Sequence, residues 1–380
     1  MVILKWCNHD TLGIGHINLK IESLTSLRFF AALMVVFSHL AFLSNSQSGL
    51  LSHLYNAIFC EGYIGVTFFF ILSGFILSYT YAEKIKSGAV NYKQFLISRI
   101  SRIYPLHIFT FLISIPLVIA GMFARNDFNF MPLFPNLILA QSFFSDATVY
   151  LSGNSPSWSL SNEMFFYLLF PLFIFCKKYI LAVLCFFTLI FHLYVPYSAL
   201  SLEDKYFYTY IFPPSRLADF LVGIILYRVF FYIDMNRCRF NVNMMQCLSI
   251  ILLIFFVSVK NFIDQYWRYD IYYVLPMAFI VFSFSFSGGA LAKILSNRTL
   301  VALGEASFSL YLIHQLVIRY VTGIGNKIIG FHGVIWDCSS SLFIIFASIG
   351  ISVMIYKYFE IKAKGFTHKI LSDFLFKKFD

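Results

Sequence analysis

The segment "LRFFAALMVVFSHL", Leu27–Leu40, is apolar enough to lie in a membrane, yet it has an arginine near its start and a histidine near its end. Ionisable side chains within a membrane helix are costly, and those that persist usually face the interior of the bundle. Arg28 and His39 are eleven residues apart, so a helix places them on one face, about 16 Å apart along its axis. For this segment alone, the favoured interpretation would be that Arg28 reaches to the interface and His39 makes a packing contact.

The composition extends the membrane interpretation to the whole chain. Of its 380 residues, 59% are hydrophobic and 12% are charged, which excludes an ordinary soluble protein. A membrane-crossing helix needs about 20 apolar residues. Ten such segments are predicted, at about 24–43, 62–81, 103–122, 159–176, 179–196, 214–233, 244–259, 271–287, 306–324 and 334–356. The expected fold class is an all-α integral membrane protein with about ten transmembrane helices.

The positions of lysine and arginine predict the orientation, because these residues collect in cytoplasmic loops. If the N-terminus is inside, twenty of the 28 lie in cytoplasmic segments and five on the opposite side. This bias predicts that both termini are cytoplasmic, and it accounts for most of the net charge of +10 without a nucleic-acid partner. The apolar segment 131–145 would invert every later loop if it crossed the membrane. It is therefore predicted to be a re-entrant or interfacial piece.

These predictions divide the chain into three parts. Residues 1–22 form a cytoplasmic N-terminal segment, residues 23–357 the membrane domain and residues 358–380 a basic cytoplasmic tail. The N-terminal segment lacks the apolar core and cleavage site of a signal peptide. The tail is basic and amphipathic enough to rest on anionic lipid.

The segment "ISRISRIYPLHIF", Ile97–Phe109, places two arginines at the predicted cytoplasmic mouth of the third span. Arg99 and Arg102 share a helix face at i, i+3 spacing, and two guanidiniums in that position can clamp a phosphate. The alternative is a positive-inside anchor with the Tyr104 ring in the aromatic belt.

A polar run enters an apolar helix in "SPSWSLSNEMFFYLLFP", Ser155–Pro171. Glu163 would be favoured near a helix start by the positive helix end, which is the simpler interpretation. The alternative is that Glu163 accepts the ring N–H of His39 and raises its basicity, since both are expected at outer-leaflet depth.

Further polar residues lie within the predicted spans. Arg216 could counter Glu163 or Asp219, and His314 is either functional or a buried hydrogen-bonding residue. The Ser-Gly pair in "FFFILSGFILSY", Phe68–Tyr79, permits close helix packing, which is favoured over approach of the backbone to a ligand.

Together these motifs resemble, in their order along the chain, the acyltransferase-3 family of bacterial membrane O-acyltransferases. The motifs are R-x(10)-H in the first span, "FFFILSGFILSY", R-x-x-R followed by "IYPL", "SWSLSNEMFFYLLFP", "RLADFLVGIILY" and "LGEASFSLYLIHQLV", over about residues 22–357. The resemblance implies an enzyme of the bacterial inner membrane that moves an acyl group, most often acetyl, from cytoplasmic acyl-CoA to a hydroxyl of an envelope glycan. O-antigen (lipopolysaccharide), capsule, exopolysaccharide and peptidoglycan all fit as the acceptor.

The resemblance implies that Arg28, His39, Arg99, Arg102 and Glu163 matter for activity, and their positions, with those of neighbouring residues, lead to expected roles. His39 and Glu163 are the expected catalytic pair, and Arg28, Arg99, Arg102 and Tyr104 are expected to bind acyl-CoA. Candidates for the acceptor or oxyanion site are Trp158, Asn162, Arg216 and His314. Expected partners are acyl-CoA, an envelope or lipid-linked glycan and membrane lipids, with no metal and no bound cofactor. The alternative function is a transporter that exports an organic acid or a lipid-linked sugar, although such a protein would more naturally show an inverted repeat.

Overall fold

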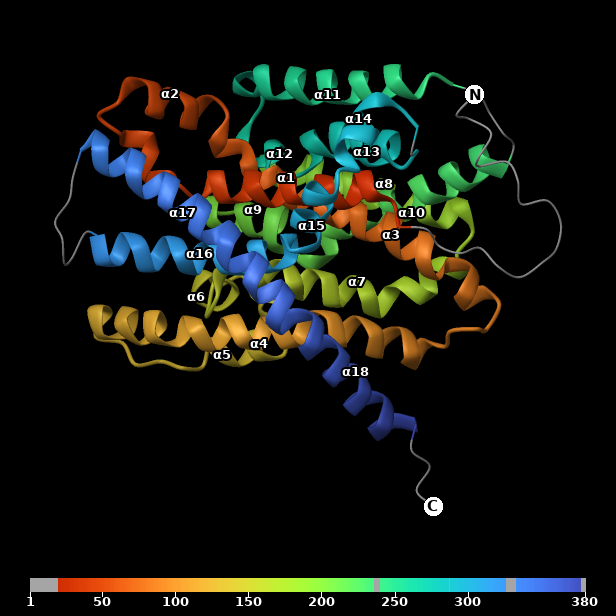
Figure 1. Ribbon diagram of the computed structural model, residues 1–380, viewed down its shortest axis with the longest axis horizontal. Helices are drawn as coiled ribbons and strands as arrows, with labels where there is room; N and C mark the ends of the chain where they lie inside the picture. The colour runs from red at the N-terminus through yellow and green to blue at the C-terminus, as the bar shows by residue number, and fades with distance from the viewer. Residues whose placement is uncertain (1–19, 236–239, 287, 326–332, 377–380) are drawn as a thin grey trace.

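The computed structural model describes residues 20–235, 240–286, 288–325 and 333–376 (Figure 1). These residues form helices, turns and short connections, and no strand occurs among them. A helix occupies each of the ten predicted apolar segments. The ten are α1 (Glu22–Ser38), α3 (Gly65–Lys86), α4 (Tyr92–Arg125), α7 (Trp158–Phe175), α8 (Lys178–Tyr194), α10 (Pro213–Met235), α11 (Val242–Ser258), α13 (Ile271–Phe284), α16 (Ser307–Ile324) and α17 (Val334–Ile355).

Eight further α-helices are described. They are α2 (Gly49–Ala57), α5 (Leu133–Leu137), α6 (Ala147–Tyr150), α9 (Leu202–Tyr206), α12 (Gln265–Arg268), α14 (Ala290–Leu295), α15 (Arg298–Glu305) and α18 (Ile361–Phe376). Segment 131–145 contains only α5 and a short 3-10 turn, so it forms no crossing helix. Whether it is re-entrant or interfacial stays a prediction.

Most of the long helices run roughly along one axis (Figure 1). The turn between α3 and α4, residues 87–91, marks one end of the bundle, on the right in Figure 1, and we call this the α3–α4 end. By length and composition, five described helices qualify as membrane spans, or six if the bent pair α15 and α16 counts as one span. The count of ten spans and the orientation stay predictions.

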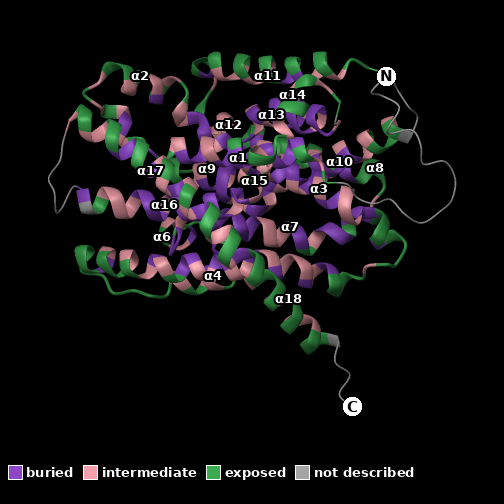
Figure 2. Cartoon of the chain, in the orientation of Figure 1, coloured by how far each residue is buried: buried purple, intermediate pink, exposed green. Residues whose placement is uncertain are grey.

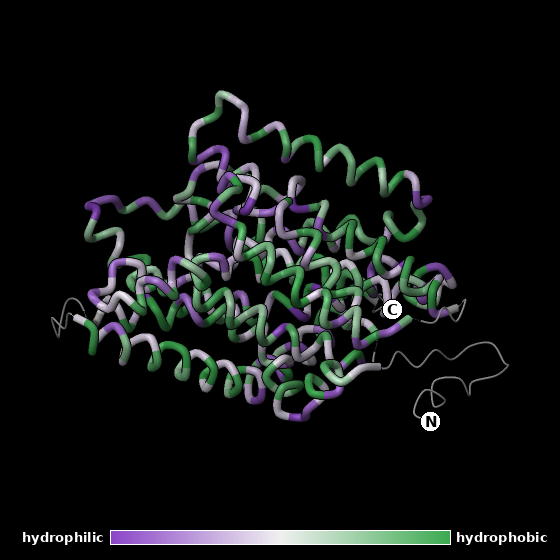
Figure 3. The backbone as a smooth tube through the Cα atoms, turned by 90° about the horizontal axis from the view of Figure 1, so that it is seen from above, coloured by the Kyte–Doolittle hydropathy of each residue, from purple (hydrophilic) through white to green (hydrophobic). Residues whose placement is uncertain are grey.

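The surface of the bundle is apolar. On α8, for example, Phe186 and Phe187 are 57% and 64% exposed, and large apolar side chains are exposed on many other helices. Figure 3 shows hydrophobic residues along much of the peripheral helices, whereas Figure 2 shows buried residues gathered around α1, α3 and α10. A soluble monomer rarely exposes apolar surface on this scale, but lipid covers it. The protein is therefore a membrane protein.

Close contact between α3 and α10 forms the centre of the core. A Cβ added at Gly74 would lie 2.1 Å from the Phe220 carbonyl oxygen, and one added at Gly223 would lie 2.0 Å from the Ile71 carbonyl oxygen. Only glycine permits backbones to approach this closely. The predicted packing role of the Ser-Gly pair in α3 is therefore confirmed.

The C-terminal part of the chain continues α17. A short π-helical turn, Tyr356–Glu360, connects α17 to α18, and α18 packs against α4. Figure 1 shows α18 running obliquely across the bundle toward the C-terminus. The tail predicted from residue 358 thus includes a helix that packs against α4 of the membrane domain. The predicted N-terminal segment lies almost entirely outside them.

Candidate active site

A cavity of about 280 Å³ opens between the long helices, and we call it the arginine cavity. It is built by α1, α3, α4, α7, α16 and α18. Its lining is Arg28, Val66, Phe69, Phe70, Leu72, Ser73, Ile76, Leu77, Arg99, Arg102, Ile103, Ser159, Leu160, Glu163, Tyr167, Phe308, Tyr311 and Lys364. On α3 alone the lining extends from Val66 to Leu77, about 16 Å along the helix axis.

Positively charged residues outnumber negatively charged ones in the lining of the arginine cavity. Arg28, Arg99, Arg102 and Lys364 are cationic, and Glu163 is the one carboxylate in the lining. Among the described residues, no carboxylate comes within 4.0 Å of any of the four cations. Charges withdrawn from water require opposite charge or strong hydrogen bonds. The cavity is therefore suited to a ligand with several negative charges.

Helix α4 fixes the two arginines of the R-x-x-R motif. A capping box between Asn91 and Gln94 starts the helix, and Arg99 and Arg102 follow two and three turns later. The Arg99 Nη2 donates to the hydroxyls of Tyr81 and Ser98, both at 2.9 Å. The two guanidiniums are thus oriented from a rigid helix, as the spacing predicted.

Glu163 is held on α7. Its Oε2 accepts a hydrogen bond of 2.7 Å from the hydroxyl of Tyr167, one turn further along the helix. Glu163 is the sixth residue of α7, beyond the first turn, so the simpler interpretation as a helix cap is wrong. It lies in the same cavity as Arg28.

His39 lies at the other end of α1 and does not line the arginine cavity. It is exposed, its Nδ1 is 2.8 Å from the carbonyl oxygen of Val35, and its ring centroid is 5.0 Å from that of His314. A carbonyl only accepts, so Nδ1 carries the proton and the neutral ring keeps a lone pair on Nε2. The predicted contact with Glu163 is therefore wrong, because a carbonyl at the helix end orients the ring instead.

His314 connects the cavity with His39. It is fully buried on α16, and its Nδ1 lies 2.6 Å from the carbonyl oxygen of Tyr311, a residue that lines the cavity. Its Nε2 is buried with no hydrogen-bond partner. Rings of Tyr311, His314 and His39 therefore run in sequence from the cavity to the end of α1.

Three other predicted site residues lie outside the cavity lining and make structural contacts. The Tyr104 hydroxyl donates to the carbonyl oxygen of Leu137 at 2.7 Å, and the Asn162 amide donates to that of Ile211 at 3.0 Å. Trp158 is buried. These side chains join α4 and α7 to neighbouring segments rather than facing the cavity.

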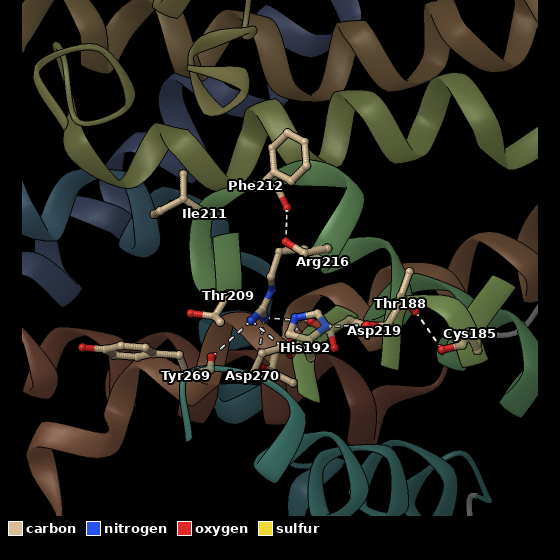
Figure 4. Close-up of polar contacts among 12 residues, drawn as sticks. Cys185, Thr188, His192, Thr209, Ile211, Phe212, Arg216, Asp219, Tyr269 and Asp270 are labelled. Carbon is tan, nitrogen blue, oxygen red and sulfur yellow. Dashed lines mark hydrogen bonds and ion pairs between the residues drawn. The ribbon is translucent and has the colours of Figure 1, made fainter. Parts of the chain in front are cut away.

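Arg216 belongs to a separate buried network (Figure 4). It pairs with Asp219 at 2.7 Å and with Asp270 at 3.0 Å, and Asp270 also lies 2.8 Å from His192 Nε2. Arg216 Nη2 donates to the Thr67 hydroxyl at 2.9 Å. Because all its charge partners are buried here, Arg216 ties α10 to α3, α8 and α13. The predicted pairing with Asp219 is confirmed, and Arg216 does not reach the cavity surface.

The cavity also contains residues that the sequence analysis missed. Lys364 lies in the tail, where composition suggested only lipid contact, and nothing in the sequence indicates that α18 returns to α4. Tyr167 could have been found, because its i+4 spacing from Glu163 places both on one helix face. Ser73 belongs to the Ser-Gly pair, for which approach to a ligand was the alternative role, and Tyr311 lies three residues before His314, but neither was named as a site residue.

The fold and the site define a helical membrane protein with a deep, cation-rich cavity. Comparison with known proteins identifies the protein family. Residues 21–357 match the sequence model of the acyltransferase-3 family, described as an acyltransferase domain. The chain belongs to this family, and it is a membrane acyltransferase.

Two relatives illustrate the range of similarity. "Acyltransferase MdmB" of Streptomyces mycarofaciens is 31% identical over 338 residues, which cover 82% of this chain and 81% of the relative. A "Putative O-acetyltransferase" of Staphylococcus aureus (strain COL) is 26% identical over 296 residues. That match covers 71% of this chain and 48% of the relative, so the chain spans about half the length of that protein. No solved structure matches the chain.

Proposed function

We propose that this protein transfers an acetyl group from acetyl-CoA to a hydroxyl of a cell-surface glycan such as O-antigen, capsule or exopolysaccharide. The observation that carries the proposal is the arginine cavity, with four cations and one carboxylate. Coenzyme A has several phosphates and a long uncharged arm, which match a cationic mouth and a deep, more apolar interior. Family membership favours transfer over the export of an organic acid or a lipid-linked sugar.

The donor enters from the α3–α4 end, which the lysine and arginine distribution assigns to the cytoplasmic side of the bacterial inner membrane. Arg99, Arg102 and the exposed Lys364 receive phosphates. The acyl arm passes Arg28 and extends toward Tyr311, at the part of the cavity nearest His314.

His39 acts as the general base on the acceptor. Its Nε2 takes the proton of the glycan hydroxyl while that oxygen attacks the thioester carbonyl. The carbon–sulfur bond breaks, and the departing thiolate receives the proton from His39. Glu163 is a positioning residue that holds Tyr167 and faces the arginines.

The first experiment tests the acceptor and the base together. Isogenic cells carry no copy of the gene, the wild type, His39→Ala or His53→Ala at matched membrane abundance, and their surface glycans are analysed by mass spectrometry and NMR. His53 is an exposed histidine on α2 and serves as the control. We expect an O-acetyl group with the wild type and His53→Ala only.

General-base assistance typically contributes about 10²- to 10⁴-fold, so His39→Ala should lower transfer by at least that order. Normal O-acylation in the His39→Ala cells would refute the role of His39. Identical glycans in all four strains would refute a surface glycan as the acceptor.

A further inference from the structure

A second cavity of about 350 Å³ adjoins the arginine cavity at the α3–α4 end. Arg28, Leu72, Ile76 and Arg102 line both. The remaining lining of this adjoining cavity is Lys20, Ile21, Leu24, Thr25, Tyr79, Thr80, Glu305 and Tyr356. Each cavity alone is near the lower limit of the roughly 300–1,000 Å³ typical of ligand pockets, so one long ligand fits the pair better than either alone.

The local structure explains how the adjoining cavity forms. Helices α15 and α16 are bent by 61° relative to each other, and Glu305 ends α15 at that bend. Gly304 allows α15 to lie against α1, since a Cβ there would be 2.0 Å from the Thr25 carbonyl oxygen. Glu305 pairs with Lys20 across the mouth. Tyr356, the first residue of the π-helical turn after α17, is half-buried in the lining.

The chemistry of the adjoining cavity differs from that of the arginine cavity. It combines two tyrosine rings, apolar side chains, one carboxylate and Lys20, with two guanidiniums at the boundary. A purine base stacks on aromatic rings, its exocyclic amine donates to a carboxylate, and a diphosphate suits paired arginines. These are the parts of an adenine nucleotide.

Resting on the proposed function, we propose that the adjoining cavity binds the adenine nucleotide end of the acyl-CoA donor. The base stacks on Tyr356 with its amine directed to Glu305, and Lys20 receives a ribose phosphate. Arg102, which lines both cavities, holds the diphosphate together with Arg99 and Lys364, and Arg28 lies beside the start of the pantetheine arm. The pantetheine arm then extends into the arginine cavity toward Tyr311.

The test compares donors with and without the nucleotide. Purified full-length protein in detergent micelles is titrated by calorimetry with acetyl-CoA and with S-acetylpantetheine, which lacks the nucleotide. We expect Tyr356→Ala to raise the Kd of acetyl-CoA about 5- to 150-fold, the effect of losing one base–aromatic stack. The Kd of S-acetylpantetheine should not change.

Two variants serve as controls. Tyr358→Ala removes an exposed tyrosine from the same turn and should bind both donors as the wild type does. Tyr356→Phe keeps the ring and should retain affinity for acetyl-CoA. Loss of affinity in Tyr356→Phe equal to that in Tyr356→Ala would overturn the stacking contact, as would an equal penalty for both donors in Tyr356→Ala.

A nucleotide analogue tests the carboxylate. The 1,N6-etheno derivative of acetyl-CoA has no amine hydrogen to donate, so it should bind the wild type more weakly than acetyl-CoA. In Glu305→Gln the difference between the two should shrink. If Tyr356→Ala binds acetyl-CoA as tightly as the wild type does, the nucleotide site is wrong and the donor proposal stands. Binding of neither donor would refute the proposed function itself.

Discussion

Replacing Arg99 by alanine tests the donor site most directly. Its Nη2 is oriented by the neutral hydroxyls of Tyr81 and Ser98, while its Nε is buried without a partner. The guanidinium is therefore positioned but not neutralised. One hydrogen bond to a charged group contributes about 1.5–3 kcal/mol, and each 1.4 kcal/mol is tenfold in affinity. Arg99→Ala should weaken acetyl-CoA binding roughly 10- to 150-fold.

Arg99→Ala should also affect KM and kcat differently. A phosphate contact is made equally in the ground state and the transition state, so Arg99→Ala should raise KM and leave kcat nearly unchanged. Arg99→Lys should fall between the wild type and alanine, because an ammonium keeps the charge but not the planar fork. Arg125→Ala is the matched control, since Arg125 is exposed at the other end of the same helix.

The assay measures Kd by calorimetry and turnover by release of free thiol from acetyl-CoA with the identified acceptor. A Kd in Arg99→Ala equal to that of Arg125→Ala would refute a phosphate at this position. A fall in kcat at unchanged KM would also refute the reasoning, because it would place Arg99 at the reacting atoms.

Three further changes test other parts of the structure. Glu163→Gln should lower the Kd of acetyl-CoA several-fold, because it removes the one carboxylate from the lining of the arginine cavity. Weaker binding of acetyl-CoA in calorimetry would contradict this. Gly74→Ala should lower the thermal unfolding temperature, since its Cβ would meet an α10 backbone oxygen at 2.1 Å at a cost of about 1–3 kcal/mol or more. Gly121→Ala, with its nearest neighbour at 3.6 Å, should not lower it. Asp270→Asn should destabilise by about 1.5–3 kcal/mol in chemical denaturation, because it removes one of the two buried carboxylates that pair with Arg216. Wild-type stability would refute that role.

The helices were predictable because long apolar stretches in a membrane protein have few alternatives to helix formation. Every one of the ten predicted segments contains a long helix, although α4 begins eleven residues earlier than predicted and includes both Arg99 and Arg102. The end of α1 was placed too late, since the helix stops at Ser38 and a 3-10 turn follows.

Residues of the candidate site were predictable only where two of them share a helix face or where a charged residue lies within an apolar segment. Arg99 and Arg102 followed from their spacing, and Arg28 from its unfavourable position in an apolar segment. The pairing of Glu163 with His39 failed because the two residues lie at different depths. Glu163 lines the cavity with Arg28, whereas His39 lies about three helical turns further along α1, where a backbone carbonyl orients its ring. Contacts between distant segments, such as Lys364 on α18, depend on packing that no local pattern contains.

The distance between the cations of the arginine cavity and His39 has a consequence for the mechanism. The cations line a cavity near the α3–α4 end, whereas His39 lies at the opposite end of α1, about 16 Å from Arg28 along the helix axis. Under the proposed function, a donor held by its phosphates would approach His39 by extending its arm toward Tyr311 and His314. The acceptor hydroxyl must reach His39 from the exposed side, so neither substrate needs to cross the whole bundle. The glycine contact of α3 with α10 and the buried Arg216 network lie beside this route and keep the helices that form it fixed.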